Sequence, residues 1–588
     1  ATHHVAPDHR AEVLLRWGDA ILPGAKGPFG SGPRDGADQA RRFGTSCDFV
    51  AFMPLPLGSA ASDHGLLCVN HEFASGHMMF PNYADRAAAW SGLTEAQARI
   101  EMEAVGHSVV EIRRDEGRWA PVADSRFNRR FTATTPMAIT GPLAGHERLC
   151  TAADPTGRAV LGTFANCAGG VTPWGTVLTA EENIQGQFWG DQARLAELSP
   201  GELRNHASLG IGFSSGPGKP VPPRHPWARV DERFDITREP REPNRFGYIV
   251  EIDPYDPESR PKKRTALGRF KHEGACVHAV DGRPVVVYMG DDERFQCIYR
   301  FVSKGVYRAG DRAANMDLLE TGDLFVARFE PDGTGRWLKL AFDGEWVTPD
   351  VTGFADETEV LIEPRFVAGL LGGTPMDRPE DIEIDPFTGR VYVALTGNDR
   401  RAATEADPAN PRAANLWGHI LEIVPPGEAG ALDHWADLFL WELPLLAGDP
   451  AAASPMERGR YRGTPTPSGW FANPDNLAFD PAGRLWIGTD GMPDLATGPV
   501  HDGLWALDPS DPAGAPRHFF GCPRGAECTG PAFTPDGTTL FVSIQHPGEE
   551  DGTSHGAPST RWPDFEPFVP PRASVMAITR KDGGPVGG

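Results

Sequence analysis

The chain has 588 residues, of which 40% are hydrophobic and 15 are tryptophan, so it can bury a large core and is not intrinsically disordered. Its formal net charge of -24 disfavours nucleic acids and anionic membranes as partners, because both repel an acidic protein. No apolar run approaches the length of a membrane span. The 68 glycines and 56 prolines indicate many turns, and therefore many short strands.

One pattern recurs along the chain: a turn with glycine, a strand of apolar and β-branched residues, and a polar or acidic end. Its copies occupy residues 63–72, 173–183, 281–293, 388–399, 482–491 and 536–549. We expect these copies to be the blades of a β-propeller. The early copies lie about a hundred residues apart, whereas a blade takes roughly forty, so insertions must decorate the propeller. The sequence therefore predicts an all-β, six-bladed propeller with large loop and short helical insertions, in a single domain over residues 1–588.

The clearest helical pattern lies in the insertion at residues 93–109. Thr94 is expected to be the N-cap of this helix, and Ile100 and Val105 are expected to face a core.

The richest stretch for chemistry runs from Asn166 to Asn183. Cys167 stands beside two glycines, a tight turn follows at residues 173–175, and a short apolar strand then ends on Glu181 and Glu182. Carboxylates are hard ligands and a thiolate is a soft one, so this mixture suits a site that holds a calcium-type ion and a transition metal. The alternative is a simple turn, a buried cysteine and a solvated acidic strand end.

A second short strand precedes the turn in each of the last four copies, which predicts a hairpin. Each of these leading strands is preceded by acids or amides, and the starts of such strands would line one mouth of the central channel: Glu273, Glu380 with Asp381, Asp475 with Asn476, and Glu527. Turn capping explains Asp281, Asp480 and Asp536, which lie in the turns themselves. The leading acids lie too far upstream to cap those turns.

Several familiar catalytic patterns are missing from the sequence. It has no G-x-S-x-G, no G-x-x-x-x-G-K-[ST] and no H-E-x-x-H, and its acids are too many to assign as a glycosidase pair. The 8 cysteines include no C-x-x-C pair, which disfavours a zinc ribbon. Cys522 and Cys528 could pair in an oxidising compartment, but their close spacing leaves this open. A multi-metal site explains the excess of acids best.

Long ordered strings in the sequence resemble one family, the PhoX-type alkaline phosphatases, over roughly Val13 to Val575. The strings that carry the resemblance are VNHEF (Val69 to Phe73), NCAGGVTPWGTVLTAEEN (Asn166 to Asn183), EPNRFGYIVEIDP (Glu242 to Pro254), KHEGA (Lys271 to Ala275), YMGDDERF (Tyr288 to Phe295), MDRPEDIEIDPFTGRVYVALT (Met376 to Thr396), NPDNLAFDPAGRLWIGTDG (Asn473 to Gly491) and ECTGPAFTPDGTTLFVSIQHPGE (Glu527 to Glu549).

The resemblance implies a six-bladed propeller that holds two ferric ions and three calcium ions bridged by an oxo group. It also implies hydrolysis of small-molecule phosphate monoesters, export by the twin-arginine route to the periplasm or beyond, and a role in phosphate acquisition. We expect a monomer.

The resemblance also implies roles for individual residues. Cys167 matches an iron-ligating cysteine, Glu273 and Glu380 match acidic metal ligands, and Arg378 matches an arginine that contacts substrate phosphate. The further expected ligands are Glu72, Glu181, Glu182, Asp292, Asp475 and Glu527, and which of the adjacent Glu181 and Glu182 binds metal stays open. Arg378 lies two residues before Glu380, so both side chains would point to the same side of an extended strand. The alternative for Arg378 is a surface arginine beside Pro379.

Two other classes of protein are compatible with acids at a propeller mouth. One is a calcium-dependent propeller lactonase or esterase, and the other is a structural or binding propeller with calcium for stability only. Cys167 and Arg378 discriminate against a lactonase, because it needs neither a thiolate ligand nor a phosphate clamp. Iron content discriminates against the structural class.

Overall fold

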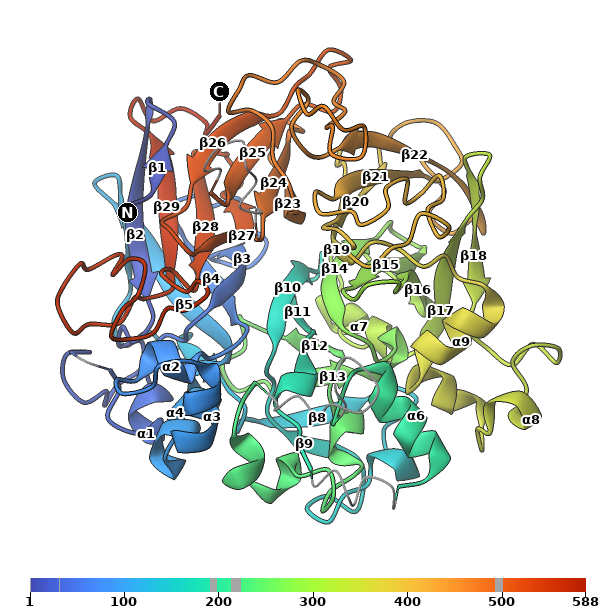
Figure 1. Cartoon of the computed structure of the whole chain (residues 1–588), viewed down its shortest axis with the longest axis horizontal. Coiled ribbons are helices and arrows are strands. Elements are labelled where there is room, and N and C mark those ends of the chain that lie inside the picture. The colour runs from blue at the N-terminus through green and yellow to red at the C-terminus, as the bar shows by residue number, and fades with distance from the viewer. Residues whose placement is uncertain (1, 31, 191–197, 213–223, 492–500, 588) are drawn as a thin grey trace.

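Six groups of mostly antiparallel strands surround a central axis in the computed structural model, which describes residues 2–30, 32–190, 198–212, 224–491 and 501–587 (Figure 1). The innermost strands of the groups are β3 (Cys47–Pro54), β10 (Asn166–Val171), β14 (His272–His278), β19 (Pro379–Ile384), β23 (Pro474–Phe479) and β27 (Glu527–Phe533). Each inner strand contacts the next one, and β27 contacts β3, so the ring is closed. We call the groups blades 1 to 6 in that order. The all-β class predicted from the sequence is confirmed.

The second strand of each blade coincides with one of the repeated sequence copies. These strands are β4 (His64–His71), β11 (Val177–Glu181), β15 (Pro284–Asp291), β20 (Val391–Leu395), β24 (Leu485–Thr489) and β28 (Thr539–Gln545).

The outer strands complete the blades. They are β5 (Gly106–Asp115), β6 (Arg118–Pro121) and β7 (Arg129–Phe131) in blade 1; β12 (Ile249–Ile252), β13 (Lys262–Arg264), β8 (Pro136–Thr140) and β9 (Ala159–Leu161) in blade 2; β16 (Ile298–Val306), β17 (Gly322–Phe329) and β18 (Thr334–Lys339) in blade 3; β21 (His419–Val424) and β22 (Leu438–Leu446) in blade 4; β25 (Gly503–Leu507), β26 (Arg517–Gly521) and β1 (His4–Val5) in blade 5; and β29 (Ser574–Arg580) and β2 (His9–Arg16) in blade 6. Strands β18 and β22 pair, which joins blades 3 and 4 into one nine-stranded sheet.

Two leading strands were missed by the sequence analysis, because a strand precedes the repeated copy in all blades and not only in the last four. Residues around Cys167, which the sequence analysis assigned to no strand, form β10, which pairs with β11. The glycines there serve close packing: a Cβ on Gly170 would lie 2.0 Å from the carbonyl oxygen of Ala275 in β14. The glycine pair therefore marks close contact between neighbouring blades.

Segments near the two ends of the chain meet in blade 6, where β2, the second strand of the chain, pairs with β29, the last. Figure 1 shows the blue and red segments side by side at that edge. This pairing closes the ring with hydrogen bonds between segments that are remote in sequence.

The helices lie in the insertions outside the ring of strands. They are α1 (Gly36–Gln39), α2 (Gly76–Met79), α3 (Arg86–Gly92), α4 (Glu95–Ala104), α6 (Pro200–Ser208), α7 (Arg312–Asn315), α8 (Pro349–Thr352) and α9 (Pro364–Leu371). The predicted helix is α4, and Thr94 caps it in a capping box with Gln97. Ile100 and Val105 are buried as expected. No helix among the described residues is long and apolar enough to cross a membrane.

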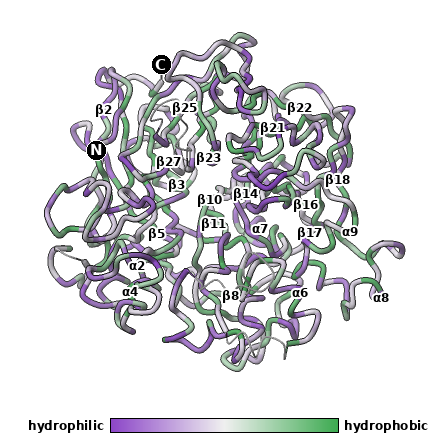
Figure 2. Tube along the Cα trace, in the orientation of Figure 1, coloured by the Kyte–Doolittle hydropathy of each residue, from purple (hydrophilic) through white to green (hydrophobic). Residues whose placement is uncertain are grey.

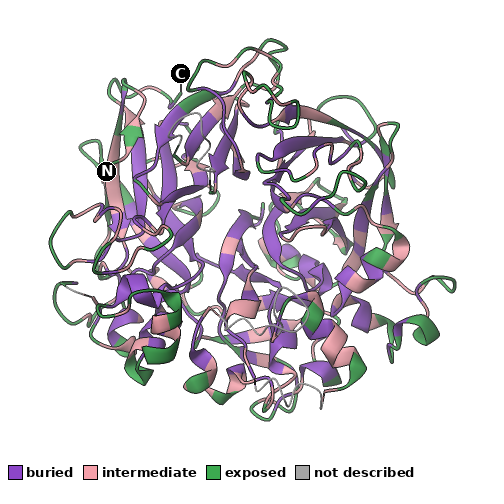
Figure 3. Cartoon of the chain, viewed as in Figure 1, coloured by how far each residue is buried: buried purple, intermediate pink, exposed green. Residues whose placement is uncertain are grey.

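Burial is concentrated in the strands, and exposed residues lie mainly in the surrounding loops and helices (Figure 3). Hydrophobic and hydrophilic residues both occur along the strands (Figure 2), since the hydrophobic ones pack between blades. Clusters such as Val286, Ile382 and Val393 join blade 3 to blade 4. The polar residues of the inner strands are left to face the channel.

Each inner strand carries a β-bulge near its start, where it has one residue more than the second strand that pairs with it. Bulges of this kind bend a strand and redirect its side chains, and they are frequent next to active sites. Because every blade has such a bulge near the start of its inner strand, the side chains there point to one mouth of the channel.

Candidate metal centre

A cavity of about 590 Å³ opens at the mouth of the channel where the inner strands begin. Its size is typical of small-molecule sites. Its acidic, thiol and basic lining residues are Asp48, Glu72, His77, Asp85, Arg86, Cys167, Glu182, Arg224, Glu273, Asp292, Arg378, Glu380, Asp475, Asp490, Glu527, His546, Glu549, Glu550 and Asp551. Acids from all parts of the chain therefore converge on one place, as the sequence predicts.

The bulges place one set of these side chains. The first irregular residue of the inner strand is Asp48 in blade 1, Cys167 in blade 2, Glu380 in blade 4 and Asp475 in blade 5. In blades 3 and 6 glycines with positive φ, Gly274 and Gly530, take that place, and Glu273 and Glu527 reach the cavity from slightly earlier positions.

The ends of the second strands place another set. The residue that follows the second strand is Glu72, Glu182, Asp292, Asp490 or His546 in five of the blades, and all of these line the cavity. In blade 4 the corresponding residue is Thr396, which is fully buried.

Four groups of three side chains among the described residues have ligand atoms within 4.8 Å of one another. The groups are Asp48, Glu72 and Cys167; Cys167, Glu182 and Glu273; Glu273, Glu380 and Asp475; and Asp490, Glu527 and His546. The first three groups share members, Cys167 and Glu273, so they form a continuous row. Carboxylate oxygens suit calcium, and the thiolate adds affinity for a transition metal.

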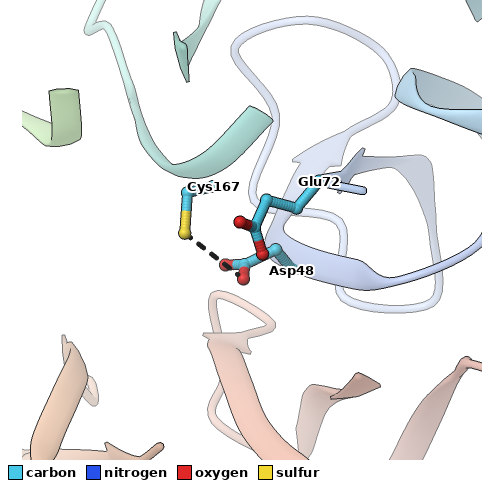
Figure 4. Close-up of side chains that lie close together, drawn as sticks. All are labelled: Asp48, Glu72 and Cys167. Carbon is cyan, nitrogen blue, oxygen red and sulfur yellow. Dashed lines mark hydrogen bonds between the residues drawn. The ribbon is translucent and has the colours of Figure 1, made fainter. Parts of the chain in front are cut away.

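Figure 4 shows the first group, in which Asp48 and Glu72 of blade 1 face Cys167 of blade 2. The Cys167 thiol donates to Asp48 Oδ2 at 3.6 Å. Gln545 Nε2 donates to Asp48 Oδ2 at 2.6 Å and to Glu72 Oε2 at 3.2 Å. The amide thus holds two carboxylates from one side and leaves other lone pairs for a cation.

The cavity concentrates buried carboxylates, whose negative charge is stabilised when cations are bound. Burial, strengthened by neighbouring carboxylates, raises the pKa of Glu273, Glu182 and Glu527 well above its usual range, and it raises the pKa of Glu72 to about 7. Both carboxylate oxygens of Glu273 are buried without a hydrogen-bond partner among the described residues. Buried acids without partners fit a centre in which metal ions compensate the charge.

Burial also raises the pKa of the Cys167 thiol well above its usual range, and the acids around it act in the same direction. A metal ion is the usual means by which such a thiol becomes a thiolate. The donor set therefore fits the metals that the sequence resemblance implies.

Arg378 lies immediately before β19, with a left-handed backbone (φ 58). Its Nε and Nη2 donate to the two carboxylate oxygens of Asp292 at 2.8 and 2.7 Å, and Nη2 lies 3.0 Å from Glu380 Oε1. Nη1 donates to no described residue. Burial opposes ionisation of Asp292, but the Arg378 guanidinium outweighs it and lowers the pKa of that carboxyl. Arg378 and Glu380 point to the same side, as expected, but the left-handed backbone and not an extended strand directs Arg378 at the cavity.

Three consecutive acids at the end of β15 each have their own cation. Arg365 donates to both carboxylate oxygens of buried Asp291, Arg378 holds Asp292, and Lys271 Nζ lies 2.7 Å from Glu293 Oε2. These contacts fix the strand end, and with it the position of the Arg378 fork.

The structure answers the question left open between Glu181 and Glu182. Glu182 lines the cavity, whereas Glu181 faces away from it and accepts hydrogen bonds from Lys263 Nζ (2.6 Å), Thr163 Oγ1 and the backbone of Gly247. Since both oxygens of Glu181 are taken, its prediction as a metal ligand is wrong. The other predicted ligands, Glu72, Cys167, Glu182, Glu273, Asp292, Glu380, Asp475 and Glu527, all line the cavity.

Sequence reasoning missed Asp48, Asp490, His546 and Arg224, which also line the cavity. Asp490 and His546 occupy the same place after their strands as Glu72 and Glu182, so alignment of the strand ends could have found them. Asp48 needed recognition of β3.

Cys522 and Cys528 are both buried free thiols in this structure. Their pairing stays a possibility that the sequence leaves open.

Comparisons with known proteins agree with this geometry. The sequence model of a family described as "Alkaline phosphatase PhoX" matches residues 1–548. The solved structure of Pseudomonas fluorescens PhoX in complex with vanadate, a transition state analogue, is similar, with 38% identity and a TM-score of 0.88 over 100% of this chain and 97% of that chain. A protein of unknown function from Dyadobacter fermentans has 9% identity and a TM-score of 0.33 over 98% of this chain and 100% of its own, a likeness too low to carry an argument. A search of curated proteins found no match.

Proposed function

Because the chain belongs to the PhoX alkaline phosphatase family, we propose that it hydrolyses phosphate monoesters in the cavity at the channel mouth and releases inorganic phosphate. The observation that carries this proposal is the row of metal-ligand groups that shares one cavity with Arg378. Phosphoryl transfer depends mainly on positioning and on neutralising the charge of the phosphate oxygens. The cavity offers groups for both tasks.

The metal content of the proposal is two ferric ions and three calcium ions bridged by an oxo group. We assign iron to the two groups that share Cys167, because only they contain a soft ligand. We assign calcium to the groups with carboxylates, as in Glu273, Glu380 and Asp475. When bound, these ions would neutralise phosphate charge and supply the nucleophile.

Arg378 would bind the transferred phosphoryl group. Two of its nitrogens are held by Asp292, so the guanidinium plane is fixed and the Nη1 edge can donate to phosphate oxygens. A preorganised donor of this kind stabilises charge in the transition state without first reorganising. Gln545 would fix the orientation of Asp48 and Glu72 by donating to one oxygen of each.

The remaining parts of the proposal concern organisation and location. The pairing of β2 with β29 supports a single domain over residues 1–588. The family resemblance supports export by the twin-arginine route to the periplasm or beyond, a role in phosphate acquisition, and action as a monomer. The net charge of -24 supports small molecules rather than nucleic acids as partners.

A calcium-dependent lactonase or esterase is the alternative function. Such an enzyme gains nothing from the Cys167 thiol in two ligand groups or from a fixed guanidinium in the cavity. The geometry therefore favours the phosphatase.

Elemental analysis of the purified protein, together with turnover of 4-nitrophenyl phosphate, tests the proposal. We expect iron and calcium in the protein, hydrolysis of the monoester, and inhibition by vanadate. Hydrolysis of a lactone in a protein that contains calcium but no iron would support the alternative instead.

A further inference from the structure

Arg224 is a third arginine that lines the cavity, beside Arg86 and Arg378. Arg86 pairs with Glu549 at 2.7 Å and Arg378 pairs with Asp292, whereas Arg224 forms no ion pair with any described residue. Its Nε is buried and has no hydrogen-bond partner in the described part of the chain. A partly buried, unpaired guanidinium is costly, so its presence in a ligand cavity points to an anion supplied from outside.

The orientation of Arg224 suits such an anion. Its guanidinium carbon lies 3.5 Å from the centroid of the Phe73 ring, so the group is stacked on the ring. Stacking uses the face of the guanidinium and leaves the N–H donors at its edge for a carboxylate or phosphate. The following residues fix the segment: His225 N donates to Gly186 O at 2.9 Å, and the Trp227 indole donates to Glu101 at 3.1 Å.

The acids that favour the charged form of Arg224 through space, Glu549, Glu72 and Glu527, form no ion pair with it in the described part of the chain. Glu549 accepts from Arg86, and Glu550 accepts from Arg524 Nε at 2.8 Å. Both carboxylates therefore have cations of their own, and Arg224 stays available to a ligand.

The position of Arg224 relative to Arg378 indicates which part of a substrate it meets. Phe73, on which Arg224 stacks, follows Glu72 at the end of β4 in blade 1, and Arg378 precedes β19 of blade 4. In the closed ring, two inner strands separate β3 from β19 on either side, so the blades are opposite. With the transferred phosphoryl group on Arg378, the leaving group extends toward Arg224.

We propose that Arg224 forms a leaving-group subsite, which binds a second oxyanion on the phosphate monoester. The preferred substrates are then esters whose alcohol part carries a carboxylate or a further phosphate. The inference rests on the proposed phosphatase function and adds the substrate class to it. The cavity of about 590 Å³ has room for a phosphoryl group and a small anionic leaving group together.

The test compares 3-phosphoglycerate with glycerol 3-phosphate, which lacks the carboxylate. Arg224→Gln should lower kcat/KM for 3-phosphoglycerate by about tenfold or more, the usual size of a lost charge-assisted contact, and should change that for glycerol 3-phosphate by less than about threefold. Arg224→Lys should lie between, because it keeps the charge and loses the fork. Arg229→Gln is the matched control: Arg229 lies five residues away, is exposed, and is outside the cavity.

A second measurement uses the wild-type protein and needs no variant. The non-hydrolysable 3-phosphonopropanoate should inhibit about tenfold more tightly than propylphosphonate, which has no carboxylate. Equal inhibition by the two, or an equal loss of both activities in Arg224→Gln, would overturn the subsite but leave the phosphatase intact. If the wild type hydrolyses neither ester, the proposed function fails and the subsite with it.

Discussion

Replacement of Arg378 by lysine tests the proposed phosphate clamp directly. The guanidinium makes two hydrogen bonds to Asp292 at 2.8 and 2.7 Å and still has Nη1 for a substrate. A lysine ammonium keeps the positive charge but cannot hold Asp292 with two parallel bonds and donate to phosphate at the same time. Loss of one preorganised charge stabiliser costs about 2–4 kcal/mol of transition-state binding. Arg378→Lys should therefore lower kcat/KM about 30- to 900-fold.

The assay is steady-state hydrolysis of 4-nitrophenyl phosphate, with inhibition by inorganic phosphate measured on the same preparations. The variant should bind phosphate more weakly, because product and substrate share the clamp. Its iron and calcium content and its melting temperature should stay near those of the wild type, since Arg378 is not a ligand. Arg283→Lys is the control: Arg283 pairs with Asp433 at 3.5 Å, and both side chains are about half exposed, so this change should have little effect. Wild-type kinetics in Arg378→Lys, or loss of metal in step with activity, would refute the reasoning.

Four further predictions concern the metals and their ligands. Cys167→Ala should lose iron and the visible absorption of a thiolate–iron bond; a variant that stays coloured and fully active would contradict the assignment. Glu182→Gln should lose metal, whereas Glu181→Gln should retain it but melt at lower temperature, because buried Lys263 loses its partner at 2.6 Å; elemental analysis and thermal denaturation distinguish the two. Chelation should abolish activity and lower the melting temperature, because the clustered acids then repel one another. In the chelated protein, burial raises the pKa of Glu72 from 4.5 to about 7, so its protonated form stabilises the fold and this stability is lost as the pH rises across that interval. The melting temperature of chelated protein should therefore be higher at about pH 5.5 than at about pH 8, with metal-loaded protein as the control, and the opposite order would count against the assignment.

The strands with strong local patterns could be predicted from the sequence, and those without them could not. The second strand of each blade is apolar, follows a glycine turn and ends on polar residues, so it is visible in one stretch of sequence. Residues 55–63 separate β3 from β4, so the sequence shows no short hairpin that would indicate β3. Asp48 was missed because it lies in β3. β10 was missed because Gly169 and Gly170, which weaken a strand pattern, are needed there for contact between blades.

The direction of individual side chains is the second feature that could not be predicted from the sequence. Glu181 and Glu182 are adjacent, so one of them must face the channel and the other must face away. The register of β11 against β10 decides between them, and register depends on packing that a single sequence does not contain. Similarly, Arg378 reaches the cavity through a left-handed backbone, which no propensity of arginine predicts.

Blade 4 differs from the other blades at the end of its second strand, and this difference explains the position of the Arg378 guanidinium. In the other blades an acid or a histidine follows the second strand and lines the cavity, but in blade 4 buried Thr396 stands there. An acid there would have added a further negative charge beside Asp292 and Glu380. Arg378 takes that side of the cavity instead and contacts both of those carboxylates. The ring of acids thus attracts cations, and blade 4 adds a fixed guanidinium beside its own acid Glu380. This asymmetry lets an anionic phosphate ester enter an acidic cavity in one orientation.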